Sequence, residues 1–412
     1  MGQTVTEKII SAHSGRKAKV GEVVIVEVDG AMASDTTAPI AIQAFKAMGG
    51  QKVWDPSRCH LVIDHAAPAP NERIANLHVM MRQFAHTQNM RIFEAGQGIC
   101  HQLMIENDLV RPGNIFIGAD SHTCSYGAIG ALATGVGSTD LAAVLLTGKT
   151  WLKVPPTIKI ELSGQMPMGT QSKDLILHLI GKLGIAGATY CAMEICGEAV
   201  TGLSLSSRLV MANMMIEAGA KTGFIHTDGL ELPYSYSPLL ADDDAKYQEL
   251  IQLDVSNLQP MISRPHSPDN VVPIELELGR KIDYAFIGSC VNGRLEDLHV
   301  AAKILSEATI HPNTRLVIGP ASKQIFMQAV KDGTVETLLR AGATFIPPGC
   351  GPCVGTHNGV PGGGEVVIST ANRNFKGRMG NPDSLVFLAS PATVAASARE
   401  GQITHPLDFL RD

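Results

Sequence analysis

The sequence predicts an α/β protein made of several subdomains, in which helices pack on sheets. Short β-branched or apolar runs alternate along the chain with helical patterns such as TDLAAVLLTGKTWL and SSRLVMANMMIEAGA. The chain has 412 residues, of which 45% are hydrophobic and 41 are glycine. A chain of this length and composition can bury a large core, and it should divide into two or three subdomains.

Five of the predicted strands end in polar or sulfur-bearing residues. Ligands of open α/β sheets bind beyond the carboxyl ends of the strands, so we expect these five ends to converge on one site. The strand segments are HLVIDHAAP, ending at Asp64 and His65; MRIFEAGQGICHQ, leading to His101; NIFIGADSHT, ending at Asp120, Ser121 and His122; DYAFIGSCVNGR, ending at Cys290; and GATFIPPGCGPC, ending at Cys350 and Cys353.

The boundary between two lobes is predicted in NLQPMISRPHSPDNVVPIE, residues 257–275. Prolines and polar residues interrupt both the strand and the helix periodicity there. We therefore assign residues 1–270 to an N-terminal α/β lobe of two subdomains. Residues 271–412 are assigned to a C-terminal α/β lobe that carries the cysteines Cys290, Cys350 and Cys353.

Composition and charge favour a small molecule as the ligand. The formal net charge is −6 and no basic run is present, which argues against nucleic acid or an anionic membrane as the main partner. The N-terminal segment MGQTVTEKIISAHSG has polar residues where a signal peptide needs an apolar run, and no stretch approaches eighteen apolar residues. We expect a cytoplasmic protein.

The segment IPPGCGPCVG places Cys350 and Cys353 in a turn of proline and glycine. In a reducing compartment a disulfide is disfavoured, and a redox C-x-x-C pair normally opens a helix rather than a proline-rich turn. Together with Cys290 the pair can hold an iron–sulfur cluster with one open position. Zinc remains an alternative, with His357 as a fourth ligand, and so do buried cysteines without a metal.

Six ordered motifs resemble the aconitase and homoaconitase family, and within it the large subunits of its two-subunit members. The resemblance covers nearly the whole chain. Two small departures are Val291, where threonine commonly follows the cysteine, and Ser34, where aconitase itself has glutamine. The motifs are DHAAP (64–68), GQGICHQ (96–102), GADSHTCSYGAIGALATGVGSTD (118–140), GSCVNGRLEDL (288–298), PPGCGPCVG (347–355) and STANRNFKGRMG (369–380).

The resemblance implies an aconitase-type catalytic unit and one [4Fe–4S] cluster with an open iron position on Cys290, Cys350 and Cys353. It also implies that this iron takes a substrate hydroxyl and a carboxylate oxygen. The sequence stops at THPLDFLRD, without the C-terminal swivelling domain of single-chain aconitases. A separate small subunit is therefore expected to supply the catalytic serine and part of the substrate pocket.

The resemblance further implies the roles of individual residues. His101 is expected to be the leading proton donor. Paired arginines suit a substrate with two carboxylates, because the guanidinium fork matches carboxylate geometry. The expected catalytic residues are Asp64, His65, His101, Asp120, His122 and Glu194, and the expected substrate-binding residues are Ser121, Asn292, Asn372, Arg373 and Arg378.

The activity implied is that of a hydro-lyase that isomerises 2-isopropylmalate and 3-isopropylmalate by dehydration and rehydration, a step of leucine biosynthesis. Homoaconitate, citramalate and 2,3-dimethylmalate are alternative substrates of the same chemistry. A different class of function, a non-catalytic binding subunit stabilised by zinc, also agrees with the cysteine spacing. An RNA-binding role is disfavoured by the acidic balance of the chain.

Overall fold

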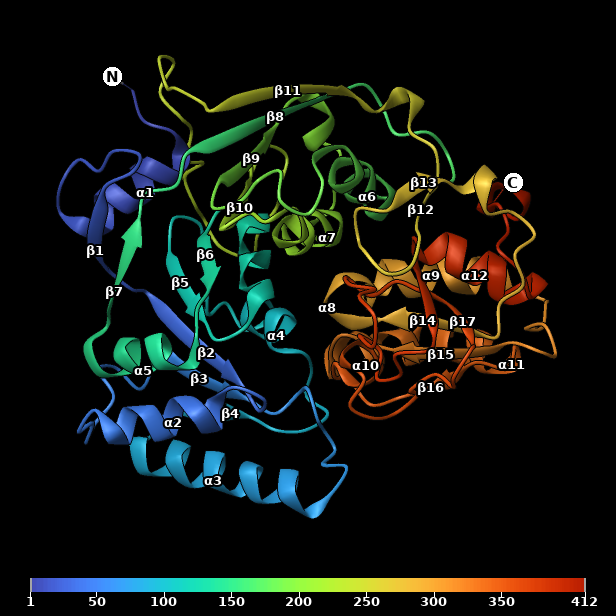
Figure 1. Ribbon diagram of the computed structural model, residues 1–412, viewed down its shortest axis with the longest axis horizontal. Helices are drawn as coiled ribbons and strands as arrows, with labels where there is room; N and C mark the ends of the chain where they lie inside the picture. The colour runs from blue at the N-terminus through green and yellow to red at the C-terminus, as the bar shows by residue number, and fades with distance from the viewer. Residues whose placement is uncertain (1, 411–412) are drawn as a thin grey trace.

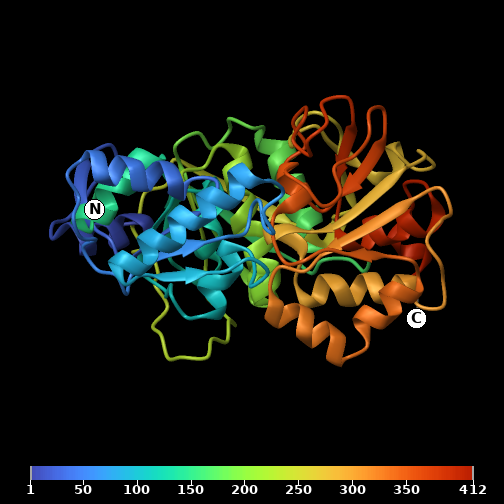
Figure 2. The same ribbon diagram turned by 90° about the horizontal axis from the view of Figure 1, so that it is seen from below.

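Three large sheets and a two-stranded ribbon organise the protein, and a computed structural model describes them over residues 2–410. Helices pack on each sheet, so the predicted α/β fold class is confirmed. Figure 1 shows the first sheet at the lower left in blue and cyan, the second above it in green, and the third at the right in orange and red. The view from below in Figure 2 shows the N-terminal and C-terminal parts side by side along the long axis.

The first sheet is parallel throughout, with strand order β4-β3-β2-β5-β6. β2, β3 and β5 are buried along their whole length, as expected for parallel strands covered on both faces. Helices α2, α3 and α5 pack together beside it. The elements are β2 Gly30–Ser34, α2 Ala38–Ala47, β3 Cys59–Val62, α3 Glu72–Gln88, β4 Arg91–Phe93, α4 Cys100–Glu106, β5 Ile115–Gly118, the 3-10 helix η1 Ser121–Ile129, β6 Leu132–Gly135 and α5 Ser138–Thr147.

A two-stranded antiparallel ribbon, β1 Val23–Glu27 with β7 Lys149–Lys153, leads from the first sheet to the second, and α1 Val5–Ser14 packs beside it. The helical pattern TDLAAVLLTGKTWL was expected to continue to residue 152, but α5 ends at Thr147. Gly148 adopts the left-handed conformation, with φ 67°, and ends the helix. The following residues alternate between exposed and buried and form β7 instead.

The second sheet is also parallel, with strand order β10-β9-β8-β11. The pattern SSRLVMANMMIEAGA forms α7 and the short 3-10 helix η3, and α7 packs against both α6 and η1. The elements are β8 Thr157–Ser163, α6 Ser172–Leu183, β9 Ala192–Cys196, η2 Glu198–Val200, α7 Leu205–Met214, η3 Met215–Ala218, β10 Thr222–Ile225, β11 Glu249–Asp254 and η4 Val255–Asn257.

The third sheet is mixed, with strand order β13-β12-β18-β17-β14-β15-β16. Five of its strands, β18, β17, β14, β15 and β16, run parallel, and β12 is antiparallel to β18. The elements are β12 Met261–Ser263, β13 Val271–Pro273, η5 Ile274–Leu276, β14 Tyr284–Gly288, α8 Ser289–Asn292, α9 Leu295–Leu305, β15 Arg315–Gly319, α10 Lys323–Lys331, α11 Thr334–Arg340, β16 Thr344–Phe345, η6 Gly351–Val354, β17 Val366–Ser369, β18 Leu385–Leu388, α12 Pro391–Glu400 and η7 Pro406–Asp408.

The predicted lobe boundary at residues 270 and 271 falls between β12 and β13, which pair as antiparallel neighbours in the third sheet. The proposed lobes also include residues 1, 411 and 412, which lie outside the described residues. The boundary remains a prediction. None of the helices in the described part of the chain combines the length and the apolar character that a membrane crossing needs.

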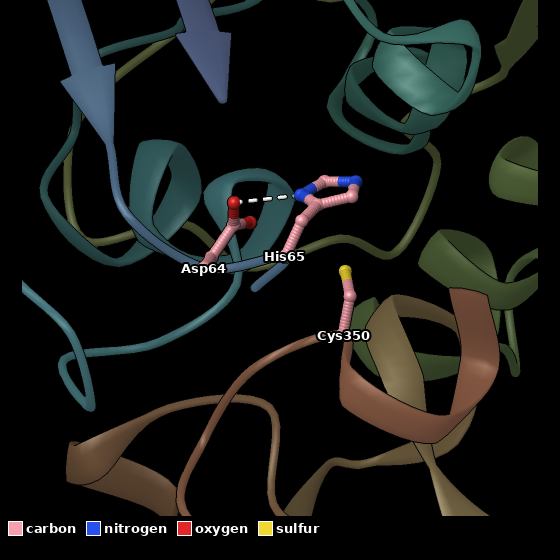
Figure 3. Close-up of side chains that lie close together, drawn as sticks. All are labelled: Asp64, His65 and Cys350. Atoms are coloured by element: carbon pink, nitrogen blue, oxygen red, sulfur yellow. Dashed lines mark hydrogen bonds and ion pairs between the residues drawn. The ribbon is translucent and has the colours of Figure 1, made fainter. Parts of the chain in front are cut away.

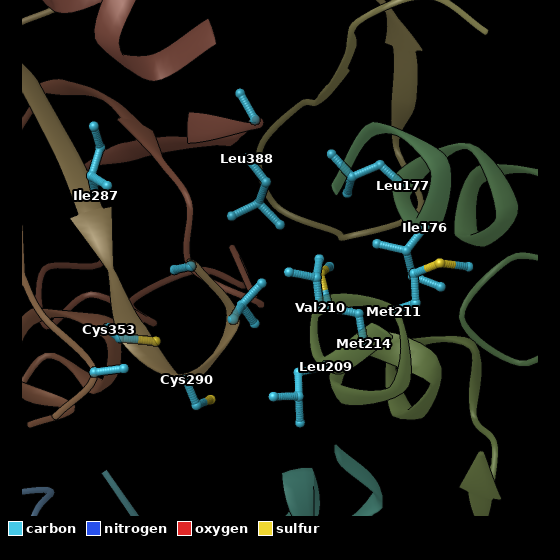
Figure 4. Close-up of a cluster of buried hydrophobic side chains, with 14 of the residues drawn as sticks. Ile176, Leu177, Leu209, Val210, Met211, Met214, Ile287, Cys290, Cys353 and Leu388 are labelled. Atoms are coloured by element: carbon cyan, nitrogen blue, oxygen red, sulfur yellow. The ribbon is translucent and has the colours of Figure 1, made fainter. Parts of the chain in front are cut away.

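One buried apolar cluster joins the second and third sheets and reaches the cysteines. Figure 4 shows Leu209 and Val210 of α7 facing Cys290 and Cys353 across this cluster. A second cluster lies around the first sheet, with α2, α3 and α5. The predicted cysteine ligands therefore lie where the three sheets meet, and their positions depend on the packing of all three.

Candidate active site

The predicted strand ends converge on one pocket of about 310 Å³. It is lined by residues that follow β3, β4, β5, β14, β16 and β17, which belong to the first and third sheets. Parallel strands place their carboxyl ends at one edge of a sheet, so residues far apart in the sequence meet there. Of the predicted site residues, the pocket lining contains His65, His101, Asp120, Ser121, His122, Cys290, Cys350, Cys353, Asn372, Arg373 and Arg378.

Local backbone structure brings Cys350 next to the first sheet. The backbone N–H of Cys350 donates to the carbonyl oxygen of Asp64 at 2.8 Å. A Cβ atom added at the preceding Gly349 would lie 2.8 Å from the same oxygen, so a side chain there would push the two segments apart. The glycine of the PPGC turn thus allows the close approach that joins the third sheet to the first.

His65 is held between two carboxylates. Its Nδ1 lies 2.8 Å from Asp64 Oδ1, and its Nε2 lies 3.3 Å from Asp120 Oδ2. Figure 3 shows the Asp64–His65 pair with the sulfur of Cys350 beside the ring. Burial lowers the pKa of His65, but the charges of Cys350 and Asp64 and the hydrogen bonds to Asp120 and Asp64 raise it well above its usual value.

Asp35, which follows β2, fixes the backbone that carries this pair. Its Oδ1 accepts the backbone N–H groups of Asp64 and His65 at 3.1 and 2.7 Å. Its Oδ2 accepts the N–H of Ala66 at 2.9 Å and contacts Nε2 of His78 at 3.2 Å. Sequence analysis did not single out this residue. An acid in the apolar context GAMASDTTAP was the available signal, because buried acids are usually paired.

Asp120 is shared by three histidines. Its Oδ1 lies 2.9 Å from His101 Nε2 and accepts the backbone N–H of His122 at 2.8 Å, while its Oδ2 faces His65. Burial raises the pKa of Asp120, but the charge and hydrogen bond of His101, with the bonds of His122 and His65, hold it well below its usual value. The carboxylate therefore fixes the orientation of the imidazoles around it.

Glu217, on η3, is an acid of this site that sequence analysis missed. Its Oε1 lies 3.0 Å from His122 Nε2, and both of its oxygens accept from Arg373 Nε, at 2.7 and 2.9 Å. Burial raises the pKa of Glu217, but its bond to His122 and the charge of Arg373 bring it below its usual value. Its place in the otherwise apolar run ANMMIEAGA was the available sequence signal.

Two asparagines place amide groups against the cysteine sulfurs. Asn213 Nδ2 lies 3.1 Å from Cys290 Sγ, and Asn372 Nδ2 lies 3.6 Å from the same sulfur. The Cys353 thiol donates to Asn372 Oδ1 at 3.6 Å. Asn372 was predicted as a polar contact at the site, whereas Asn213 on α7 was not predicted. Amide N–H groups aimed at sulfur stabilise thiolates, so they suit sulfur atoms that bind metal.

All eight cysteines of the chain are buried and unpaired, so no disulfide uses Cys350 or Cys353. Burial raises the pKa of Cys350 to about 12, partly opposed by the charge of His65, and burial also raises that of Cys290. Such thiols ionise only beside a compensating positive charge. Three buried thiols around one pocket, with amide donors facing sulfur, fit a thiolate-bound metal group.

The structure does not bring Glu194 or Asn292 to the pocket lining. Glu194, on β9, is buried elsewhere, where His226 Nε2 and the Tyr247 hydroxyl contact its Oε1 at 3.0 and 3.1 Å. Asn292 Nδ2 donates instead to Asp297 Oδ1 at 2.9 Å. His357, the zinc ligand considered above, is likewise absent from the lining, and its Nδ1 contacts the Thr356 hydroxyl at 2.9 Å.

Arg378 lines the pocket, and its buried Nε has no hydrogen-bond partner within the described residues. Buried donors are rarely left unpaired, so this guanidinium suits an anionic ligand. The pocket therefore combines a cation for carboxylates with imidazoles whose orientation is fixed by acids. This arrangement can bind a carboxylate substrate and transfer protons to and from it.

The family model "Aconitase family (aconitate hydratase)" matches residues 7–280 and 277–401. The chain is 47% identical over 418 residues to 3-isopropylmalate dehydratase large subunit 1 of Methanopyrus kandleri, with 100% of both chains covered. It is 46% identical over 420 residues to the protein of the same name from Thermotoga maritima, again with 100% of both covered.

Among solved structures, the crystal structure of Thermococcus kodakaraensis aconitase X in its holo-form is similar, with a TM-score of 0.51 and 13% sequence identity. The alignment covers 85% of this chain and 84% of that one. At this identity the likeness concerns the fold alone. The family model covers nearly the whole chain, and the full-length relatives agree with it; the chain belongs to the aconitase family.

Proposed function

We propose that this chain is the large subunit of a 3-isopropylmalate dehydratase, a hydro-lyase that interconverts 2-isopropylmalate and 3-isopropylmalate in leucine biosynthesis. The observation that carries this proposal is one pocket in which three thiols, three imidazoles and two guanidinium groups meet. It is supported by the names of full-length relatives that are 46–47% identical.

We propose that Cys290, Cys350 and Cys353 hold one [4Fe–4S] cluster with an open iron position. When bound, the cluster supplies a Lewis acid toward the substrate's hydroxyl and a carboxylate. The thiols of all three residues are buried at the pocket, and the amide groups of Asn213 and Asn372 face the sulfurs.

The remaining residues act on protons and carboxylates. His101, with its Nε2 fixed by Asp120, is the proposed proton donor to the leaving hydroxyl. Arg378 is the proposed partner of a substrate carboxylate. Glu217 holds Arg373 and His122 in place through one carboxylate.

A separate small subunit is proposed to complete the site with the serine that removes the carbon-bound proton and with part of the pocket for the substrate's side chain. The relatives' names, which include the words "large subunit", support a two-subunit enzyme. We therefore expect the chain alone to have little or no activity. Homoaconitate, citramalate and 2,3-dimethylmalate remain the alternative substrates that the reconstituted complex should be tested with.

The decisive experiment measures iron and acid-labile sulfide per chain after anaerobic purification and reconstitution. We expect about four of each for the wild type, and their loss in Cys350→Ser. The control is Cys191→Ser, because Cys191 is not part of the pocket lining. Zinc without sulfide in the wild type would contradict the proposal and favour the zinc-stabilised binding protein.

The substrate assignment is tested separately in the complex with the small subunit. Arg378→Lys should weaken binding and turnover of isopropylmalate while iron and sulfide stay unchanged, since lysine offers no planar fork for a carboxylate. Unchanged turnover and affinity in this variant would remove Arg378 from the site. Turnover of homoaconitate or citramalate in preference to isopropylmalate would overturn the proposed substrate but not the reaction class.

A further inference from the structure

A fully buried lysine lies behind the cysteine pocket. Lys173 exposes none of its surface, and among the described residues it is the one lysine in the buried set. Its Nζ donates to the backbone carbonyl oxygens of Thr370 and Ala371, at 2.8 and 2.7 Å. Both of these partners are neutral, so neither cancels the charge of the ammonium. A buried ammonium without an anionic partner is costly and calls for an explanation.

The local structure makes this cost larger. Lys173 lies in the first turn of α6, where the aligned peptide dipoles already present positive charge. The carboxylate of the neighbouring Asp174 is hydrogen-bonded elsewhere, since its oxygens accept the backbone N–H groups of Gln171 and Met261 at 2.8 and 2.9 Å. Burial lowers the pKa of Lys173 to about 7. A methionine would fill the same space without these penalties, so packing alone does not account for a lysine here.

The groups that Lys173 holds lead directly to the proposed cluster ligands. Thr370 precedes Asn372 by two positions, and Asn372 contacts the sulfurs of Cys290 and Cys353. The Thr370 hydroxyl also donates to the carbonyl oxygen of Gly288 at 3.1 Å and accepts its N–H at 2.9 Å, two residues before Cys290. Lys173 therefore holds a backbone segment that contacts both cysteine-bearing segments, the one with Cys290 through Thr370 and the one with Cys353 through Asn372.

The charges around Lys173 also connect this residue to the cysteines. Burial lowers the pKa of Lys173, whereas negative charge on Cys353, Cys290, Asp297 and Asp174 raises it. Cys353 and Cys290 stay ionised when a metal group is bound, because cysteine binds metal as the thiolate. The groups that accept hydrogen bonds from Lys173 are neutral, and the cysteine thiolates of the pocket supply the negative charge instead.

We infer that Lys173 is the buried counter-charge of the metal group held by Cys290, Cys350 and Cys353, and that it raises the reduction potential of that group. The inference rests on the proposed [4Fe–4S] cluster. A cluster held by three thiolates carries net negative charge, which increases when an electron is added. A fixed positive charge nearby stabilises the reduced state more than the oxidised state, so it favours reduction. Lys173 is a positioning residue in this account and does not touch the substrate.

The test compares Lys173→Met and Lys173→Gln with the wild type and with Lys182→Met, an exposed lysine on the same helix. Iron and sulfide are measured first, and the midpoint potential follows from an anaerobic dithionite titration monitored by electron paramagnetic resonance. We expect the potential to move to more negative values in both Lys173 variants and to stay unchanged in Lys182→Met. Glutamine can still donate to a carbonyl, so a wild-type potential in Lys173→Gln would show that hydrogen bonding alone matters and would overturn the inference.

A second measurement keeps the inference testable if the cluster-loaded variants are unstable. Chemical unfolding should show that Lys173→Met loses more stability with the cluster bound than without it. The loss of the hydrogen bonds to the Thr370 and Ala371 carbonyl oxygens costs the same in both forms, whereas the attraction between the ammonium and the cluster is lost only when the cluster is bound. Equal destabilisation of both forms would mean that Lys173 has a structural role only. A wild type without iron and sulfide would refute the proposed function itself, whereas a normal cluster with an unchanged potential in both variants would refute only the role of Lys173.

Discussion

Replacing Asp35 by asparagine tests whether one carboxylate holds the loop that carries Asp64 and His65. In the wild type the two oxygens accept three backbone N–H groups and face His78 Nε2. Asparagine has only one acceptor oxygen. In either orientation its NH2 group replaces one carboxylate oxygen of Asp35 and faces a backbone N–H. His78 can change tautomer and accept from that amide, but a backbone N–H cannot adapt.

The magnitude follows from these contacts. An unpaired buried donor costs about 1–3 kcal/mol, and weakening the remaining charge-assisted bonds adds on the order of 1 kcal/mol. We therefore expect the free energy of unfolding to fall by about 3 kcal/mol in Asp35→Asn, measured by denaturant unfolding of the cluster-free chain. The control is Asp243→Asn, which changes an exposed aspartate in a loop.

The pH dependence gives the same prediction a second readout. Burial raises the pKa of Asp35, but its hydrogen bond with His78, the charge of His65 and the backbone N–H groups bring it well below the usual value of 3.8. Its contribution to stability is therefore present above pH 3.8 and lost as the pH falls below it. The difference between wild type and Asp35→Asn should shrink in acid. A variant as stable as the Asp243→Asn control at pH 7 would refute this account of the loop.

Three further predictions follow from other contacts. Glu217→Gln should lower turnover of the reconstituted complex by about 10–100-fold with iron and sulfide unchanged, because a neutral amide cannot hold both His122 and Arg373. Wild-type turnover in this variant would contradict the role of Glu217. Burial lowers the pKa of His13, but hydrogen bonds to Asp29 and to the Ile9 carbonyl raise it above 6.5. The stability lost in His13→Gln should therefore be largest below pH 6.5 and disappear as the pH rises through the folded-state pKa. A stability difference independent of pH would show that the His13–Asp29 pair does not stabilise the fold. Gly127→Ala would place a Cβ atom 1.8 Å from the Gly223 carbonyl oxygen, so it should lower the free energy of unfolding by about 3 kcal/mol or more. The control Gly202→Ala, whose Cβ atom would meet nothing within 4 Å, should lower it by less than about 1 kcal/mol. Equal losses in denaturant unfolding would disprove the steric explanation.

The order of strands and helices followed from local patterns, since strand and helix periodicity depend on neighbouring residues. The five apolar runs that lead to Asp64, His101, Asp120, Cys290 and Cys350 all form strands. The error at residues 149–152 has a local cause as well, because a glycine in the left-handed conformation ended α5 inside an apolar pattern. The strand-end rule, which depends only on parallel strands sharing an edge, was enough to predict a common pocket.

Partners within the site were harder to predict, because a carboxylate has no sequence periodicity that identifies what it faces. Glu194 and Glu217 are both acids in apolar surroundings, and the sequence offers no physical reason to prefer one of them. The structure pairs Glu194 with His226 and Tyr247 but Glu217 with His122 and Arg373, because β9 and η3 occupy different places around the second sheet.

The sequence by itself determined the fold class, the family and the residue types that reach the pocket, since these depend on local periodicity and ordered motifs. The tertiary structure alone decided which groups support them: Asp35 beneath the His65 loop, Asn213 against Cys290, and Lys173 behind the strand end at Thr370. Each of these contacts joins residues at least 30 positions apart, across separate packed elements. Their distances are set by how three sheets pack together, and no pattern along the chain specifies that packing.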